Sequence, residues 1–70
     1  MLSFPGVDAE RALRLRALAG VGCAVTIERG PGDEGETCVI ERDGLRVTGR
    51  GATADAAAAE ALRRWDGAGA

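Results

Sequence analysis

The chain has 70 residues, a net charge of −2 at pH 7, and nine basic residues that are all arginines. Histidine, lysine and tyrosine are missing, which excludes the commonest general base, the commonest metal ligand and a Schiff-base lysine. No segment has the roughly 20 apolar residues of a membrane span, and the first residues do not resemble a signal peptide. We therefore expect a cytoplasmic, non-membrane protein that is not an enzyme. A single domain should span residues 1–70, with an ordered core at about 7–66 and a flexible tail at 67–70.

The first predicted element is a helix that follows an extended lead-in at residues 2–7, which contains the turn signal Pro5-Gly6. Asp8 has the side chain of an N-cap, and Gly20 follows the last helical residue, Ala19. The apolar residues at helical spacing that we expect to face the core are Ala12, Leu15, Leu18 and Ala19. Leu13 falls on the opposite face, where it is either an ordinary exposed leucine or part of a contact patch for a partner.

Three segments with alternating patterns predict strands at residues 23–29, 36–42 and 45–50. The loop at 30–35 contains three glycines and a proline, and Asp43-Gly44 is a strong signal for a two-residue type I′ turn. The sequence therefore predicts a three-stranded antiparallel sheet that is built from two consecutive hairpins.

The turn and the loop also predict which residues face each other. The turn pairs Arg42 with Leu45, and symmetric closure of the loop pairs Ile27 with Cys38 and leaves Cys23 near Arg42. The two cysteines would then be too far apart for a disulfide, so we expect two small buried hydrophobic residues and not a disulfide or a redox pair. The apolar face of the sheet would carry Val25, Ile27, Cys38, Ile40, Leu45 and Val47.

A second helix is predicted after Thr53, which is suited to cap it. Its inward residues would be Ala58, Ala61, Leu62 and Trp65, at spacings of i, i+3, i+4 and i+7. Both helices would cover the apolar face of the sheet. The predicted fold is therefore an α+β, α-β-β-β-α two-layer sandwich.

Three local motifs carry a resemblance to a known family. They are the loop Gly30-Pro31-Gly32-Asp33, the turn Asp43-Gly44, and the run Gly49-Arg50-Gly51-Ala52-Thr53 before an alanine-rich helix. Together they resemble the double-stranded-RNA-binding domain, and the resemblance implies the same element order and duplex RNA as a partner. A shared packing solution, with glycine for a bend and alanine for close approach, would explain the same motifs.

The sequence departs from that family where the family contacts RNA. Positions that resemble its lysine-rich helix start hold Ala54, Asp55 and Ala58, and its loop histidine is replaced by Asp33. Duplex RNA is bound mainly through phosphate and 2′-OH contacts, and affinity falls as cations are lost. An alternative function is that of a divergent double-stranded-RNA-binding domain. Because the family's lysines are absent, such a domain would contact RNA through the arginines Arg11, Arg14, Arg16 and Arg50.

The leading expectation is a non-catalytic protein-binding module without cofactor or metal. The acidic residues Asp33, Glu34 and Glu36 lack the spacing of a calcium-binding loop and favour a solvated acidic surface that steers a basic partner. The first or third strand could pair with a partner's edge, and Leu13 could add a contact. The partner would be another protein or a second copy. Small acidic chains of this kind are also similar to phage-encoded inhibitors, including anti-CRISPR proteins, which act by surface occlusion.

Overall fold

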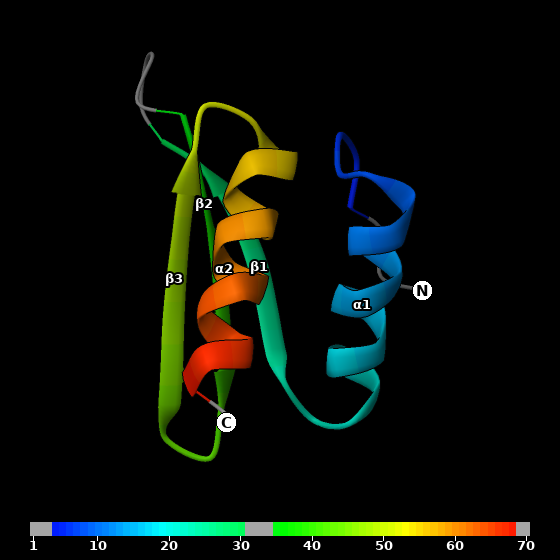
Figure 1. Cartoon of the computed structure of the whole chain (residues 1–70), viewed down its shortest axis with the longest axis vertical. Helices are drawn as coiled ribbons and strands as arrows, with labels where there is room; N and C mark the ends of the chain where they lie inside the picture. Colours follow the sequence, from blue (N-terminus) through cyan, green and yellow to red (C-terminus); the bar gives the residue numbers. More distant parts are fainter. Residues whose placement is uncertain (1–3, 31–34, 69–70) are drawn as a thin grey trace.

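The computed structural model describes residues 4–30 and 35–68 and has the predicted element order (Figure 1). The elements are α1 (Ala9–Gly20), β1 (Ala24–Arg29), β2 (Glu36–Arg42), β3 (Leu45–Gly51) and α2 (Ala54–Ala68). The strands form one antiparallel sheet in the order β1-β2-β3. The prediction of an α+β fold with a three-stranded antiparallel sheet is confirmed.

Local signals set the ends of the helices and the turn between β2 and β3. The carboxylate of Asp8 accepts a hydrogen bond from the backbone nitrogen of Glu10 (3.2 Å), and the hydroxyl of Thr53 accepts one from Ala56 (3.1 Å). Asp43 and Gly44 have φ angles of 51° and 84°, and this pair of positive values is the signature of a type I′ turn. Both caps and the turn are therefore as predicted.

The predicted register is confirmed along both hairpins. Ile27 lies opposite Cys38, and Arg42 lies opposite Leu45. β1 begins at Ala24, one residue later than predicted, and the backbone nitrogen of Cys23 donates to the carbonyl of Leu18 at the end of α1 (3.0 Å). Cys23 and Cys38 are both buried and free, as expected for two small buried hydrophobic residues.

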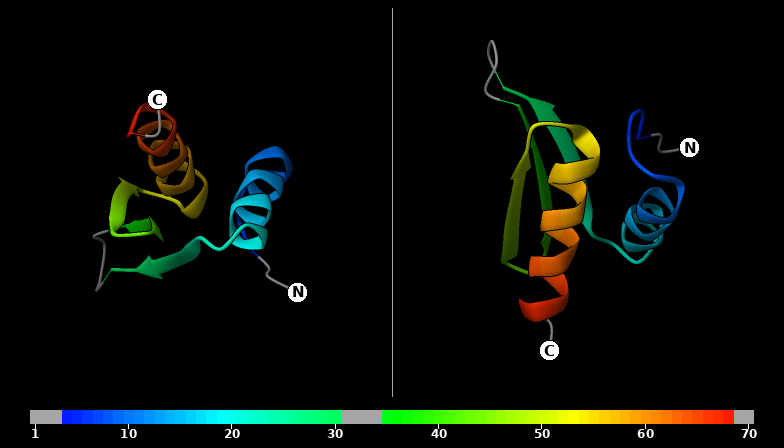
Figure 2. Two further views of the ribbon diagram at one scale, coloured as in Figure 1. Left: turned by 90° about the horizontal axis from the view of Figure 1, so that it is seen from below. Right: turned by 45° about the horizontal axis from the view of Figure 1, so that its top comes forward.

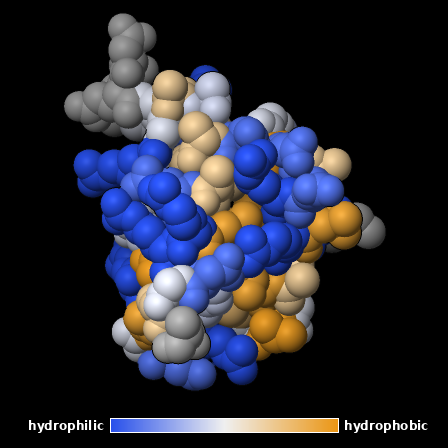
Figure 3. All heavy atoms as spheres, in the orientation of Figure 1, coloured by the Kyte–Doolittle hydropathy of each residue, from blue (hydrophilic) through white to orange (hydrophobic). Residues whose placement is uncertain are grey.

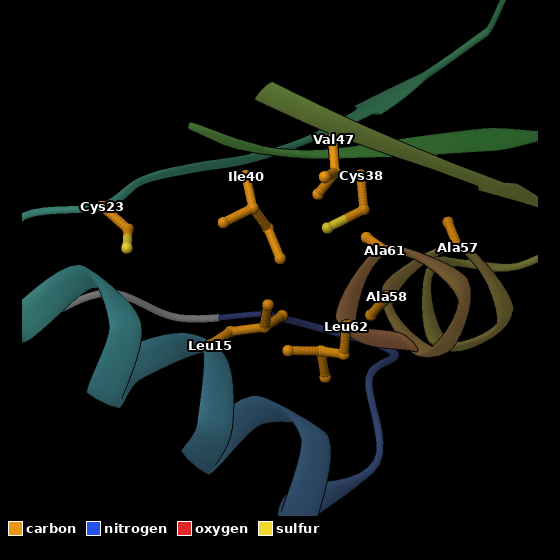
Figure 4. Packing of buried hydrophobic residues seen from close by; sticks show 9 residues of the cluster. All are labelled: Leu15, Cys23, Cys38, Ile40, Val47, Ala57, Ala58, Ala61 and Leu62. Atoms are coloured by element: carbon orange, nitrogen blue, oxygen red, sulfur yellow. The ribbon is translucent and has the colours of Figure 1, made fainter. Parts of the chain in front are cut away.

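Both helices lie on the same side of the sheet (Figure 2). α2 packs across β3 and β2, while α1 lies farther out, beside β1. The buried cluster between them, drawn in Figure 4, comprises Leu15, Cys23, Cys38, Ile40, Val47, Ala57, Ala58, Ala61 and Leu62. Because α1 does not lie across the middle of the sheet, the predicted inward residues Leu18 and Ala19 are only half-buried.

α2 approaches the sheet closely, and this explains why it buries more residues than the sequence predicted. Ala57 and Ala54 are buried in addition to the predicted alanines, and Trp65 is only half-buried. A side chain at Gly49 would overlap the backbone of Ala57 and Ala61, so β3 and α2 are in contact along their backbones. This contact supports the packing explanation for the glycine-rich run before α2.

Two other details differ from the sequence-based expectation. Residues 4–7 were expected to be extended but form a turn, in which the backbone nitrogen of Val7 donates to the carbonyl of Phe4 (3.2 Å). α2 continues to Ala68, two residues into the predicted tail, because Gly67 does not interrupt the helix. Among the residues that the structure describes, no helix has the length and apolar content needed to cross a membrane.

Candidate functional site

The outer edge of β1 has backbone groups that the sheet does not use. The backbone nitrogen of Gly30 donates to the carbonyl of Gly35 (2.8 Å). This bond shows which of the opposite pairs between β1 and β2 are the hydrogen-bonded ones. Hydrogen-bonded pairs alternate along an antiparallel ladder, so Val25, Ile27 and Arg29 direct their N–H and C=O groups away from β2. No other described strand lies beyond β1 to receive these groups.

A cleft of about 460 Å³ lies next to this edge. Phe4 and Pro5 reach it from the N-terminal turn, and Ala54 reaches it from the start of α2. The strands contribute Val25, Thr26, Ile27, Arg29 and Glu36. Phe4, Val25 and Ile27 are half-buried and pack against the edge of the core, which makes the cleft apolar on one side and open to solvent on the other.

The opposite edge of the sheet, along β3, is partly covered by a side chain of α2. The guanidinium of Arg64 donates to the backbone carbonyl of Thr48 (3.1 Å) and forms an ion pair with Glu60 (2.8 Å). A charged residue that covers an edge strand discourages pairing with another chain. Of the two edges expected to be available to a partner, β1 is therefore the more open.

Charge is divided across the outer face of the sheet, which the helices do not cover. Glu28 lies on this face of β1, whereas Arg46 and Arg50 lie on β3. Arg46 faces Glu41 across the β2–β3 ladder, and Arg50 faces Thr37. The outer face therefore carries one acidic side chain, Glu28, on β1 and two basic side chains, Arg46 and Arg50, on β3.

Two of the four arginines predicted for RNA binding form ion pairs between the helices. Arg11 donates to both oxygens of Asp55 (3.0 and 3.1 Å), and Arg14 donates to both oxygens of Asp66 (2.7 and 2.8 Å). Asp55 also accepts a hydrogen bond from the backbone nitrogen of Asp8 (2.9 Å). Asp55 therefore links α1 to α2. The resemblance implies a phosphate-binding lysine at this position.

The other two arginines of that set lie on different elements. Arg16 is on α1, whereas Arg50 is on β3, and α2 lies between these two elements (Figure 1). Both side chains are exposed. The structure does not bring the four predicted arginines together into one surface.

The residues predicted for protein binding are also distributed over the molecule. Glu36 lines the cleft at the start of β2, while Asp33 and Glu34 lie outside the described residues. Leu13 is on α1 and is 60% exposed, as expected from its place on the helix. Hydrophobic surface is visible over α1 at the right of Figure 3. Leu13 does not line the cleft beside β1.

The two cysteines do not form a reactive pair in this structure. Burial raises the pKa of the Cys38 thiol to about 11, so this thiol stays protonated at neutral pH. Within residues 4–30 and 35–68, no group of three or more potential metal ligands lies together.

Sequence reasoning did not find the apolar part of the cleft. Phe4, Pro5 and Ala54 come from segments that the sequence treats as a lead-in and a helix start. One signal was present, since Phe4 is the chain's single phenylalanine and directly precedes a Pro-Gly turn that folds it back.

The chain was also compared with family models, curated proteins and solved structures, and none of them matches.

Proposed function

We propose that this protein is a non-catalytic protein-binding module that accepts an extended segment of a partner at the edge of β1. The observation that carries the proposal is a row of backbone groups at Val25, Ile27 and Arg29 that no other described strand uses, beside a cleft with one apolar wall. An exposed edge of this kind binds a partner by strand addition: main-chain hydrogen bonds give affinity, and pockets for alternate side chains give specificity.

The expected affinity is modest. Each added hydrogen bond contributes about 0.5–1.5 kcal/mol, and an apolar side chain that fills the cleft contributes about 1.5–3 kcal/mol. Part of this energy is offset because binding orders the partner segment. Such a module suits a small inhibitor or adaptor that covers a surface of its partner. A phage-encoded inhibitor is one kind of protein that this proposal includes.

The ion pairs of α1 favour a protein partner over duplex RNA. Arg11 and Arg14 would have to leave Asp55 and Asp66 before they could contact phosphates. Asp55 itself would repel a phosphate at the start of α2. The β1 edge needs no such rearrangement to accept a strand.

The test uses a substitution that removes one edge donor and leaves the sheet intact. The N–H of Ile27 points away from β2, so Ile27→Pro removes no bond of the β1–β2 ladder, and proline is tolerated at such edge positions. Ile27→Ala is the matched control, because it removes the side chain and keeps the N–H.

The probe is a seven-residue peptide of alternating valine and glutamine, titrated into isotope-labelled protein. In the unmodified protein we expect chemical-shift changes and slower amide exchange at Val25, Ile27 and Arg29 when the peptide is added. Ile27→Ala should bind the peptide more tightly than Ile27→Pro does. Shifts confined to β3, or equal binding by both variants, would contradict strand addition at β1.

A further inference from the structure

We infer that the segment accepted at the β1 edge alternates apolar with basic residues, and that its basic side chains lie on the outer face beside Glu28. This inference rests on the proposed function and specifies the chemistry of the partner. It follows from the two different surfaces that an added strand would meet, one on each side of the sheet.

The inner side of the edge selects apolar residues. Side chains of a strand alternate between faces, so every second residue of an added strand would point to the helix side. There it would meet the half-buried Val25 and Ile27 and the cleft formed with Phe4 and Ala54. Beside Val25 and Ile27, away from Arg29 and Glu36 at the far end of the cleft, a charged side chain would lose hydration without gaining a partner.

The outer side of the edge selects a positive charge. The outer residues of β1 are Ala24, Thr26 and Glu28, all exposed, and Glu28 is the charged one. On β2, the residue opposite Glu28 is Thr37, which carries no charge. No ion pair of Glu28 is present within the described residues.

The nearest arginines on the outer face are too distant to neutralise Glu28. Arg46 and Arg50 lie on β3, two strands away, which is about 10 Å at the usual strand spacing. This separation is comparable with the Debye length at moderate salt. A basic residue on an added strand would instead lie directly beside Glu28, with Cβ atoms about 5 Å apart.

The energetic effect of one such pair is small but measurable. A favourable cross-strand charge pair contributes up to about 1 kcal/mol, which corresponds to roughly a fivefold change in affinity. A like-charged pair weakens binding by a similar factor. The affinities of two peptides with opposite charge at the outer positions should therefore differ by about tenfold or more at low salt.

The experiment compares three seven-residue peptides in which valine alternates with lysine, glutamine or glutamate. We expect the lysine peptide to bind most tightly and the glutamate peptide most weakly. Glu28→Arg should reverse this order, and Glu28→Gln should reduce the differences. Glu10→Gln is the matched control, since it makes the same charge change on α1 and should preserve the order.

A fourth peptide separates strand addition from simple charge attraction. It is the lysine peptide with an N-methyl group on its central valine, which removes a backbone donor and keeps the charge. We expect it to bind about two- to twelvefold more weakly than its parent, the loss that one hydrogen bond of about 0.5–1.5 kcal/mol implies. Equal binding of these two peptides would overturn strand addition and, with it, both proposals.

The remaining outcomes distinguish this inference from the proposed function. If the lysine, glutamine and glutamate peptides bind equally and shift Val25, Ile27 and Arg29, strand addition stands and the preference for a basic partner is wrong. If none of the peptides binds, both the proposed function and this inference are overturned.

Discussion

Gly49 shows how one residue determines the distance between the sheet and α2. A Cβ built on Gly49 would overlap the backbone nitrogen of Ala61 and the carbonyl oxygen of Ala57. Neither atom belongs to a flexible side chain, so the clash could be relieved only if the whole helix moved. The glycine and the alanines of α2 thus act together, and a change on one side of the contact affects both elements.

We therefore expect Gly49→Ala to destabilise the fold by about 3 kcal/mol or more, at the upper end of overpacking effects. Gly20→Ala is the control, because nothing lies within 4 Å of a Cβ at Gly20 and alanine favours a helix. Urea unfolding followed by circular dichroism should show a large loss of stability for the first variant and a change of less than about 1 kcal/mol for the second. Equal stability of the two variants would mean that α2 does not pack on β3 as described.

At the scale of the elements, the sequence predicts the sheet better than the position of the helices. The type I′ turn at Asp43-Gly44 allows one pairing of its strands, so the register between β2 and β3 could be read directly from it. The placement of α1 depends on long-range contacts, such as that between Arg11 and Asp55, which are 44 residues apart in the sequence. No local pattern reveals such a pair.

Asp55 is the main polar link between α1 and α2. It accepts hydrogen bonds from Arg11 and from the backbone nitrogen of Asp8, and it lies in the first turn of α2, where a negative charge is favourable. Exposed ion pairs contribute little, and the side chains of Arg11 and Asp55 are 40% and 37% exposed. The backbone hydrogen bond and the helix position therefore account for most of its expected effect.

We expect Asp55→Ala to lower the free energy of unfolding by about 1–2 kcal/mol, the sum of a lost hydrogen bond and a lost helix-terminus charge. Asp55→Asn should restore part of this loss, because its amide oxygen can still accept from Asp8. Asp66→Ala, which removes only the more exposed pair with Arg14, should cost less than about 1 kcal/mol. Urea titration of the three variants measures these differences, and an equal cost for Asp55→Ala and Asp66→Ala would argue against the link.

The cleft belongs to the whole molecule and could not be predicted from any single segment. Its wall combines Phe4 from the N-terminal turn, Ile27 from β1 and Ala54 from α2. Alternation in β1 did predict that Val25 and Ile27 face the helices, but α1 lies too far out to cover them fully. The open edge is therefore a consequence of how the helices share the sheet: α2 occupies β2 and β3, and α1 leaves β1 half-covered.

The distribution of charge over the whole molecule leads to an expectation for RNA. Duplex RNA requires several cations on one surface, but the net charge is −2, Arg11 and Arg14 are ion-paired, and Arg16 and Arg50 lie on different elements. We expect no binding to a duplex of about 20 base pairs, longer than the roughly 16 that the resembled fold covers, at tens of micromolar protein and low salt. Arg16→Glu and Arg50→Glu should behave like the unmodified protein in this titration. Binding that weakens steeply with added salt and is lost in Arg50→Glu would instead make the arginine surface the functional site and remove the charge argument for a protein partner.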